Sequence, residues 1–316
     1  MMNRLIIGLF LLVMTACGHT GQKQDAKDPD VSNPVSGDTI SKGFPMPELP
    51  AMLMGENDIR EYLVIHFWER FDFSDSLQLE DKQSVLQGLA NFITLAREVP
   101  ENREGVVRVG VETLCKGITA HSGVTDSLKY YVEEYLYNPN SPYYNENLYG
   151  IYLENMIAGL GKDNPQVSSY QFKLKLIRKN RIGEKAENFV FYLPDGTRKS
   201  LYDTPVRGNR LVLVFYDPEC HSCHDILMGM FADTTLQEAV ACGKATVLAV
   251  YTEGDRDVWR KYLNGMPRNW IIGEDRMVIK DKALYDLKAM PTLYLLDEEK
   301  IVLLKDVPYE RIIQGL

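Results

Sequence analysis

Residues 210–225 read RLVLVFYDPECHSCHD and join an apolar run, a proline-containing turn and two cysteines in a CxxC pattern. The run 211–216 is short and rich in β-branched and aromatic residues, which predicts a buried strand. If a helix begins at Cys220, its unpaired N–H groups and dipole favour a thiolate there. Cys223, one turn further on, is then placed to attack a mixed disulfide formed at Cys220. The stretch therefore predicts a dithiol–disulfide redox site.

A second motif lies about seventy residues later, where Met290-Pro291-Thr292 precedes the apolar run 293–296. The stretch "AMPTLYLLD" resembles the cis-proline element that faces the CxxC in thioredoxin-like proteins. Together with "GEKAENFVFYLPDG" upstream, it makes residues 183–316 similar to the TlpA-like and ResA-like thiol–disulfide oxidoreductases.

The resemblance implies an α/β thioredoxin-like domain at the carboxyl end of the chain. It also implies that Cys220 is the nucleophile, that Cys223 resolves the mixed disulfide, and that Pro291, the Met290 backbone and Thr292 shape a groove for an extended substrate. The chain departs from the pattern at Glu219, where a tryptophan is usual, at the dipeptide 221–222, and at Val214, where thioredoxin has a buried acid.

Two histidines stand next to the cysteines. If protonated, His221 and His224 favour the thiolate electrostatically. The run CHSCH also matches the attachment motif for c-type haem, and two cysteines with two histidines can bind zinc or copper. A structural disulfide without turnover is a further alternative. The preceding strand and the later proline element favour dithiol exchange, so we expect no metal and no cofactor.

The amino terminus resembles a bacterial lipoprotein leader. Asn3-Arg4 and the apolar run 5–13 are typical of a signal peptide, and Met14-Thr15-Ala16-Cys17 resembles a lipobox. This implies a signal peptide over 1–16 and a lipid on Cys17, while an ordinary secretory signal is the alternative. Gly18, rather than Asp, follows the cysteine, which implies an outer-membrane location in the cell envelope. Residues 17–43 are polar and predict a flexible tether.

Residues 44–182 predict a helical domain of unknown role. Apolar positions recur at helical spacing, and Pro100, Asn138-Pro139 and Asn164-Pro165 separate the segments. The expected helices are residues 58–71, 79–99, 105–119, 125–137, 146–160 and 167–181. From residue 183 the helical spacing gives way to short β-like runs separated by turns. Residues 183–316 therefore predict a hairpin over 189–202, strands at 245–251 and 270–272, helices at 257–263 and 279–287, and a hairpin over 292–305.

Several residues outside the two motifs have more than one interpretation. We expect His66 and His121 to pack or lie on the surface. The tyrosines predict a packing layer, or alternatively a face for a partner; they are Tyr130, Tyr131, Tyr135, Tyr137, Tyr143, Tyr144, Tyr149 and Tyr152. The cations near 173–181 predict a solvated helix end. Cys115 and Cys242 are expected to be buried thiols, with a bridge between the domains as the alternative.

Charge and motifs exclude other classes. The net charge of −9 argues against nucleic acid, because phosphate binding requires a basic face. The sequence lacks GxSxG, HExxH, P-loop and GxGxxG motifs, and Asp217 stands where peroxiredoxins have a threonine. We therefore expect an enzyme that reduces protein disulfides, with a lipid anchor in the membrane and an envelope thiol donor as partner. The alternative is a binding or scaffold lipoprotein whose helical domain recruits a partner.

Overall fold

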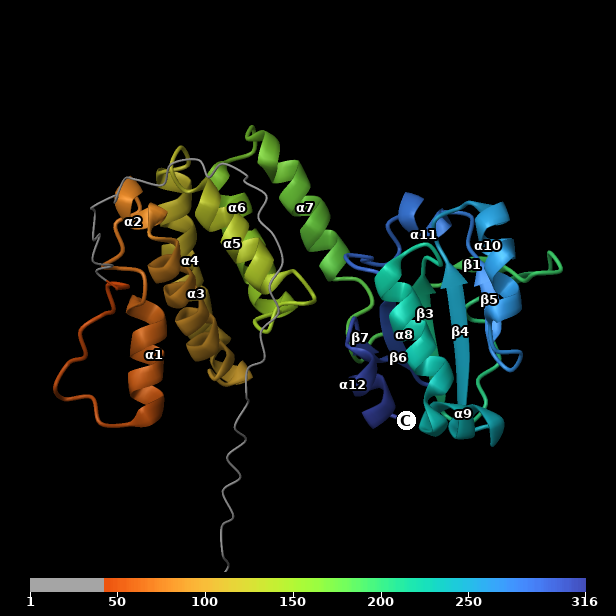
Figure 1. Ribbon diagram of the computed structural model, residues 1–316. Coiled ribbons are helices and arrows are strands. Elements are labelled where there is room, and N and C mark those ends of the chain that lie inside the picture. Colours follow the sequence, from red (N-terminus) through yellow and green to blue (C-terminus); the bar gives the residue numbers. More distant parts are fainter. Residues whose placement is uncertain (1–42) are drawn as a thin grey trace, which may run out of the picture. The chain divides into compact units, whose positions relative to one another are not determined.

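Helices form the first half of the part that the computed structural model describes, residues 43–316 (Figure 1). They are α1 (Glu56–His66), α2 (Ser76–Glu80), α3 (Lys82–Arg97), the 3-10 turn η1 (Glu101–Arg103), α4 (Glu104–Ala120), α5 (Asp126–Leu136), α6 (Glu146–Leu160) and α7 (Pro165–Ile177). The predictions for the signal peptide, the Cys17 lipid and nearly all of the tether fall on residues 1–42, outside the described part.

Side-chain caps set several helix starts. Asn145 accepts a hydrogen bond from the Leu148 backbone N–H and begins α6 at the predicted residue. The expected helix 79–99 is instead two helices, because Asp81 leaves helical geometry and caps the start of α3 by accepting from the Ser84 N–H. Capping of this kind satisfies N–H groups that a helix start leaves unpaired.

The expected helix 58–71 is too long, since α1 ends at His66. The apolar stripe continues through turns, where Glu69 and Phe71 donate backbone hydrogen bonds to His66 and Trp68. Phe71 then packs against Trp68 and Phe44 in an aromatic cluster, which the linear pattern did not distinguish from one helix face.

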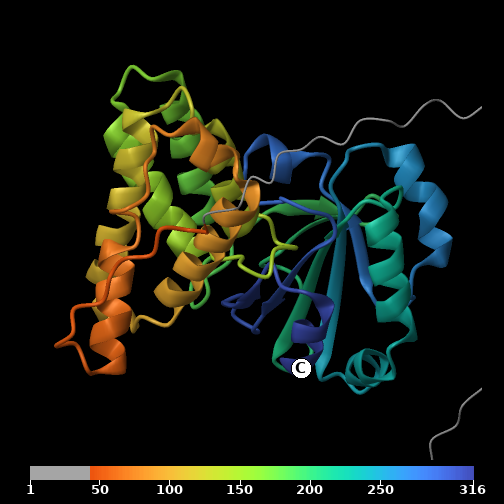
Figure 2. The ribbon, with the colours of Figure 1, turned by 60° about the vertical axis from the view of Figure 1, so that its left-hand side comes forward.

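The helices of the first half pack together (Figure 2), and residues from all of α1–α7 form a hydrophobic core of their own. Val64, Phe92, Leu114 and Tyr149 are among its fully or almost fully buried members. Gly110 lets α4 approach α1 closely, because a Cβ atom there would lie 2.3 Å from the Val64 carbonyl oxygen.

A mixed sheet follows, and in the described residues it has seven strands in the order β2-β1-β5-β4-β3-β6-β7. The strands are β1 (Val190–Tyr192), β2 (Arg198–Ser200), β3 (Arg210–Tyr216), β4 (Ala245–Tyr251), β5 (Ile271–Glu274), β6 (Thr292–Leu296) and β7 (Val302–Lys305). β3, β4 and β5 are parallel, while β6 runs antiparallel to β3. This is an α/β arrangement after a helical region, as the sequence predicts.

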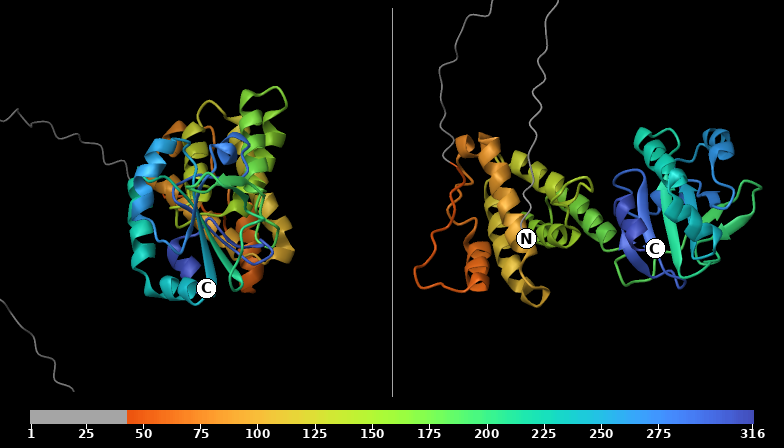
Figure 3. Two further views of the ribbon diagram at one scale, coloured as in Figure 1. Left: turned by 90° about the vertical axis from the view of Figure 1, so that its right-hand side faces the viewer. Right: turned by 60° about the horizontal axis from the view of Figure 1, so that its bottom comes forward.

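Helices complete the sandwich (Figures 1 and 3). They are α8 (His221–Ala232), α9 (Thr234–Ala241), α10 (Arg256–Tyr262) with the 3-10 turn η2 (Leu263–Gly265), α11 (Val278–Asp281) and α12 (Tyr309–Gln314). Alternate residues of β3 belong to two different hydrophobic clusters. Val214 lies in the cluster with residues of α8, α9, α10 and α12, and Leu213 lies in the cluster with residues of α11 and the β1 hairpin. β3 is therefore buried on both faces.

The chain between the two halves covers the edge of β7. Gly183 N–H donates to the Val302 carbonyl, Val302 N–H donates to Glu184, and Ala186 N–H donates to Lys300. Residues 41–316 form one compact unit.

The predicted helix 279–287 is wrong beyond its first residues. α11 ends at Asp281, because Ala283 adopts a left-handed backbone with φ of 46°. The carbonyls of Ala283 and Leu284 then accept hydrogen bonds from Lys179 and Asn180. The helices α9 and α12 were not predicted from the sequence.

Candidate active site at the two cysteines

A tight turn places Cys220 at the end of β3. Cys220 N–H donates to the Asp217 carbonyl, and the Asp217 carboxylate accepts from the Glu219 N–H. Cys220 is the N-cap of α8, with φ of −82° and ψ of 124°, and its carbonyl accepts from the His224 N–H. The predicted order of strand, turn, CxxC and helix is thus present in the structure.

The two thiols have different surroundings. Cys220 is half-buried, whereas the Cys223 side chain is fully buried and packs in the same cluster as Val214. Burial raises the pKa of Cys223 to about 12, and the hydrogen bond with Cys220 adds to this effect. The backbone N–H of Asp217, which lies 3.4 Å from the Cys223 sulfur, lowers the pKa but does not offset the burial. Both cysteines are free thiols in this structure.

A loop from the other side of the sheet faces Cys220. The Met290–Pro291 peptide bond is cis, as the resemblance implies, and Cys220 Sγ donates to the Met290 carbonyl at 3.8 Å. The loop enters β6, whose Thr292 pairs with Phe215. Thr292 is buried and its hydroxyl donates to the Ala289 carbonyl at 2.6 Å, so its side chain stabilises the loop from inside.

The two histidines lie on the outer side of the helix start. Both are exposed, and His221 Nε2 is 3.5 Å from Asp225 Oδ2, one turn further along α8. At such exposed positions, solvent and salt screen the interaction between charges. Their effect on the thiols stays a prediction.

The remaining cysteines differ from each other. Cys115 is buried, as predicted, and its thiol lies 3.7 Å from the Tyr152 carbonyl. Cys242 is exposed, so the prediction of a buried thiol is wrong there. α9 ends at Ala241, and Gly243 with φ of 74° turns the chain away, which leaves Cys242 outside the helix. Both are free thiols, and no bridge joins them in the described residues.

The tyrosines are chiefly a packing layer. Tyr149 and Tyr152 are buried and stacked, while Tyr130 is 60% exposed. Two others reach the α/β half: Tyr137 OH donates to Asp286 Oδ1 at 2.9 Å, and Tyr144 OH accepts from Lys288 Nζ at 2.8 Å. These contacts could not be predicted from the sequence, because no periodic pattern links residues so far apart in the chain.

The cations at 173–181 are mostly held in ion pairs or hydrogen bonds. Lys173 pairs with Glu133, Arg178 with Glu154 and Arg181 with Glu184. His66 Nδ1 lies 2.7 Å from Glu69, and His121 is exposed. His66 and His121 therefore have packing or surface roles, as expected. Lys179 departs from the predicted solvated helix end, because its Nζ donates to the Ala283 carbonyl at 2.8 Å.

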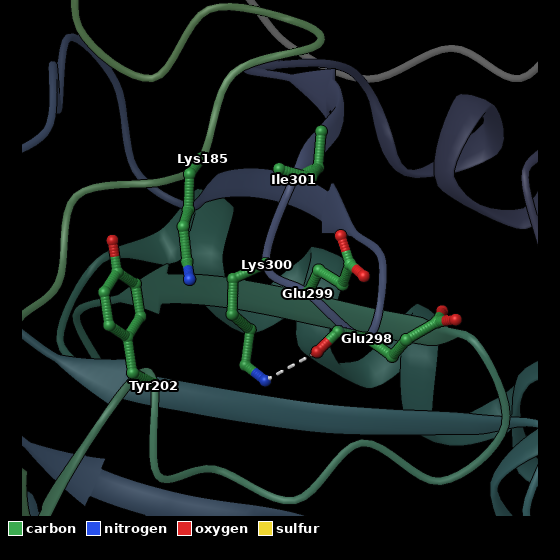
Figure 4. Close-up of a pocket in the computed structure, with 6 residues that line it drawn as sticks. All are labelled: Lys185, Tyr202, Glu298, Glu299, Lys300 and Ile301. Carbon is green, nitrogen blue, oxygen red and sulfur yellow. Dashed lines mark hydrogen bonds between the residues drawn. The ribbon is translucent and has the colours of Figure 1, made fainter.

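A hollow of about 260 Å³ lies at the β6–β7 turn, lined by Lys185, Tyr202 and residues 298–301 (Figure 4). Lys185 Nζ lies 4.4 Å from the centre of the Tyr202 ring, and Lys300 Nζ donates to the Glu298 carbonyl. Leu296, at the start of the β6–β7 turn, pairs with Leu211 of β3. Leu211 lies five residues, or roughly 17 Å, from Tyr216, where β3 ends before the cysteine turn. The hollow does not belong to the cysteine site.

Residues 43–316 show neither a metal-binding cluster nor a membrane-spanning helix. Within them no group of three His, Cys, Asp or Glu side chains is placed to hold a metal ion. None of their helices has the length and apolar character required to cross a bilayer.

Comparison with known proteins gives one family match and several similar solved structures. The family model described as a domain of unknown function (DUF5106) matches residues 16–180. A crystal structure of a thioredoxin-like protein from Bacteroides caccae is 33% identical and covers 87% of this chain and 98% of its own, with a TM-score of 0.75. No curated protein matches the chain.

Two further solved structures each match less than half of this chain. The C-terminal domain of an uncharacterized protein from Bacteroides fragilis is 40% identical over 43% of this chain and 97% of its own, with a TM-score of 0.42. A domain of a possible thiol-disulfide isomerase from Cytophaga hutchinsonii is 26% identical over 44% of this chain and 92% of its own, with a TM-score of 0.38.

Proposed function

Because this chain belongs to the thioredoxin-like proteins and carries a DUF5106 domain in its first half, we propose that it is a thiol–disulfide oxidoreductase. One observation carries the proposal. A half-buried cysteine at a helix N-cap faces the carbonyl of a cis-proline loop, and a second, buried cysteine lies one helical turn behind it.

In the proposed reaction, the Cys220 thiolate attacks one sulfur of a substrate disulfide. A mixed disulfide forms, and the other substrate sulfur leaves as a thiolate. That thiolate can accept the proton of Cys223, whose pKa of about 12 keeps it protonated until then. Cys223 next attacks Cys220 Sγ, the Cys220–Cys223 disulfide forms, and the second substrate thiolate leaves. The substrate gains two electrons and the pair loses two.

The exposed side of the site favours a peptide substrate. Met290 presents its backbone beside Cys220, and a strand-like segment that lies along the loop can bond to that backbone. Extended protein segments with an accessible disulfide are therefore the proposed substrates, with Pro291 and Met290 as the groove residues.

The finer assignment rests on the sequence resemblance. The TlpA-like and ResA-like pattern supports a reductant of the bacterial envelope that an external dithiol donor returns to the reduced form. The lipobox-like residues 14–17 support a lipid on Cys17 and an anchor in the outer membrane. These are proposals about location and direction.

A coupled assay tests the function. The purified chain, supplied with an excess of dithiol, should reduce a disulfide-containing protein catalytically, and Cys220→Ala should abolish the turnover. Cys223→Ala should trap substrates as mixed disulfides at Cys220, and these identify the partners by mass spectrometry. All variants should carry Cys242→Ser, because the exposed Cys242 thiol would trap disulfides by itself. Turnover that survives in Cys220→Ala would rule out the proposed site, and no turnover in the wild type would favour a binding protein.

A further inference from the structure

Lys288 is a buried lysine that joins the two halves of the chain. Its side chain is 4% exposed. Its Nζ lies 2.8 Å from Glu146 Oε1 and 2.8 Å from the Tyr144 hydroxyl, both in the helical half, and 2.9 Å from Asp306 Oδ2 in the α/β half. A buried ammonium group needs such partners, because its desolvation cost is otherwise uncompensated.

The residues before Lys288 are attached to the helical half as well. Lys179 Nζ donates to the Ala283 carbonyl at 2.8 Å, and Asn180 Nδ2 donates to the Leu284 carbonyl at 2.9 Å. Asp286, also 4% exposed, accepts from the Tyr137 hydroxyl. The helical half therefore contacts this segment at four positions between residues 283 and 288.

This segment has little regular structure of its own. α11 ends at Asp281 and β6 begins at Thr292, so residues 282–291 lie outside helices and strands. Backbone outside such elements takes its position from the groups that bond to it. Two residues after Lys288, the same segment presents the Met290 carbonyl to Cys220 Sγ.

We propose that the helical half positions the cis-proline loop, with Lys288 as the positioning residue. The inference rests on the proposed function and assigns a role to the DUF5106 domain: it sets the loop geometry that an extended disulfide substrate meets. Lys288 contacts neither the substrate nor the cysteines and acts through the chain that leads to Met290.

Lys305 provides a matched control. Its side chain is 5% exposed, and its Nζ lies 2.8 Å from Glu146 Oε2 and 2.8 Å from the Ile177 carbonyl. It joins the same two halves through the same glutamate, but it stands in β7, outside the segment 282–291. Lys288→Met and Lys305→Met thus remove similar buried ion pairs, and only the first should release the loop.

The experiment compares both variants in the full chain with two measurements. Hydrogen exchange of the backbone amides at 284–290 should speed up about tenfold in Lys288→Met and less than about twofold in Lys305→Met. The KM for a peptide disulfide should rise about tenfold in Lys288→Met, while the alkylation rate of Cys220 by iodoacetamide stays within about twofold. Urea unfolding measures the stability loss of each variant.

The outcomes separate the inference from the function. Equal exchange and KM changes in the two variants would overturn the positioning role, because they would reflect loss of stability alone. Unchanged exchange at 284–290 in Lys288→Met would also overturn it. If the wild type reduces no disulfide, the proposed function is refuted, and with it the role of the loop in substrate binding. Faster hydrogen exchange at 284–290 in Lys288→Met alone would then show that Lys288 holds the loop without serving catalysis.

Discussion

Isolating each thiol of the CxxC pair should reveal a large difference in reactivity. Cys220→Ser leaves Cys223 and Cys223→Ser leaves Cys220, both in a Cys242→Ser background. With its pKa raised to about 12, about one Cys223 thiol in ten thousand is ionised at about pH 8. A free cysteine with a reference pKa of about 8.5 is about one quarter ionised at that pH.

The more basic sulfur is also the better nucleophile once ionised. A Brønsted slope of about 0.4–0.5 over this difference in pKa makes its thiolate about forty times more reactive. Ionisation and nucleophilicity together should therefore slow Cys223 about sixtyfold relative to a free cysteine, and the steric effect of burial adds to this factor.

The assay is alkylation by iodoacetamide, followed by mass spectrometry with a cysteine peptide as the internal standard. The rate at Cys223 should rise about tenfold per pH unit from about pH 8 to 10, because its thiolate is far from saturation there. Cys220, half-buried at the helix N-cap, should react at least as fast as the peptide. If Cys223 matches the peptide, or its rate levels off near about pH 9, the assignment of roles to the two cysteines is wrong.

Three further predictions concern anchoring, redox direction and packing. Cys17→Ser should prevent partition of the mature protein with membranes, and an intact mass that shows unmodified Cys17 in the wild type would refute the anchor. The reduction potential, measured in glutathione buffers, should fall between about −270 and −180 mV, whereas a value near about −120 mV would indicate an oxidant. Gly110→Ala should destabilise the protein by about 1–3 kcal/mol in urea unfolding, because the added Cβ meets the Val64 carbonyl. Gly105 lies on the same helix with open space around it, so Gly105→Ala should not lower the free energy of unfolding and can raise it by up to about 1 kcal/mol. Equal losses of stability in the two variants would contradict the packing argument.

Local patterns were sufficient for much of the fold. The strand at β3 and the full extent of α6 follow from apolar spacing, and the helix start after Cys220 follows from the CxxC pattern. Helix ends were less predictable, because the apolar stripe of α1 runs on into turns whose aromatic residues pack in the same core.

Contacts between distant residues could not be predicted in this way. Lys288, Glu146 and Asp306 are ordinary charged residues in the sequence, and only the folded chain brings them within hydrogen-bonding distance. The exposure of Cys242 likewise depends on where α9 ends, which the positive φ of Gly243 decides.

The chain that covers β7 has a consequence for aggregation. Unpaired N–H and C=O groups on an edge strand are a template for another chain to add a strand. Residues 183–186 occupy those groups at Lys300 and Val302. A truncated protein that begins at residue 187 would lose this cover and expose the β7 edge to self-association. One that begins at residue 183 would retain the cover, so that choice of first residue should decide whether the isolated α/β half stays monomeric.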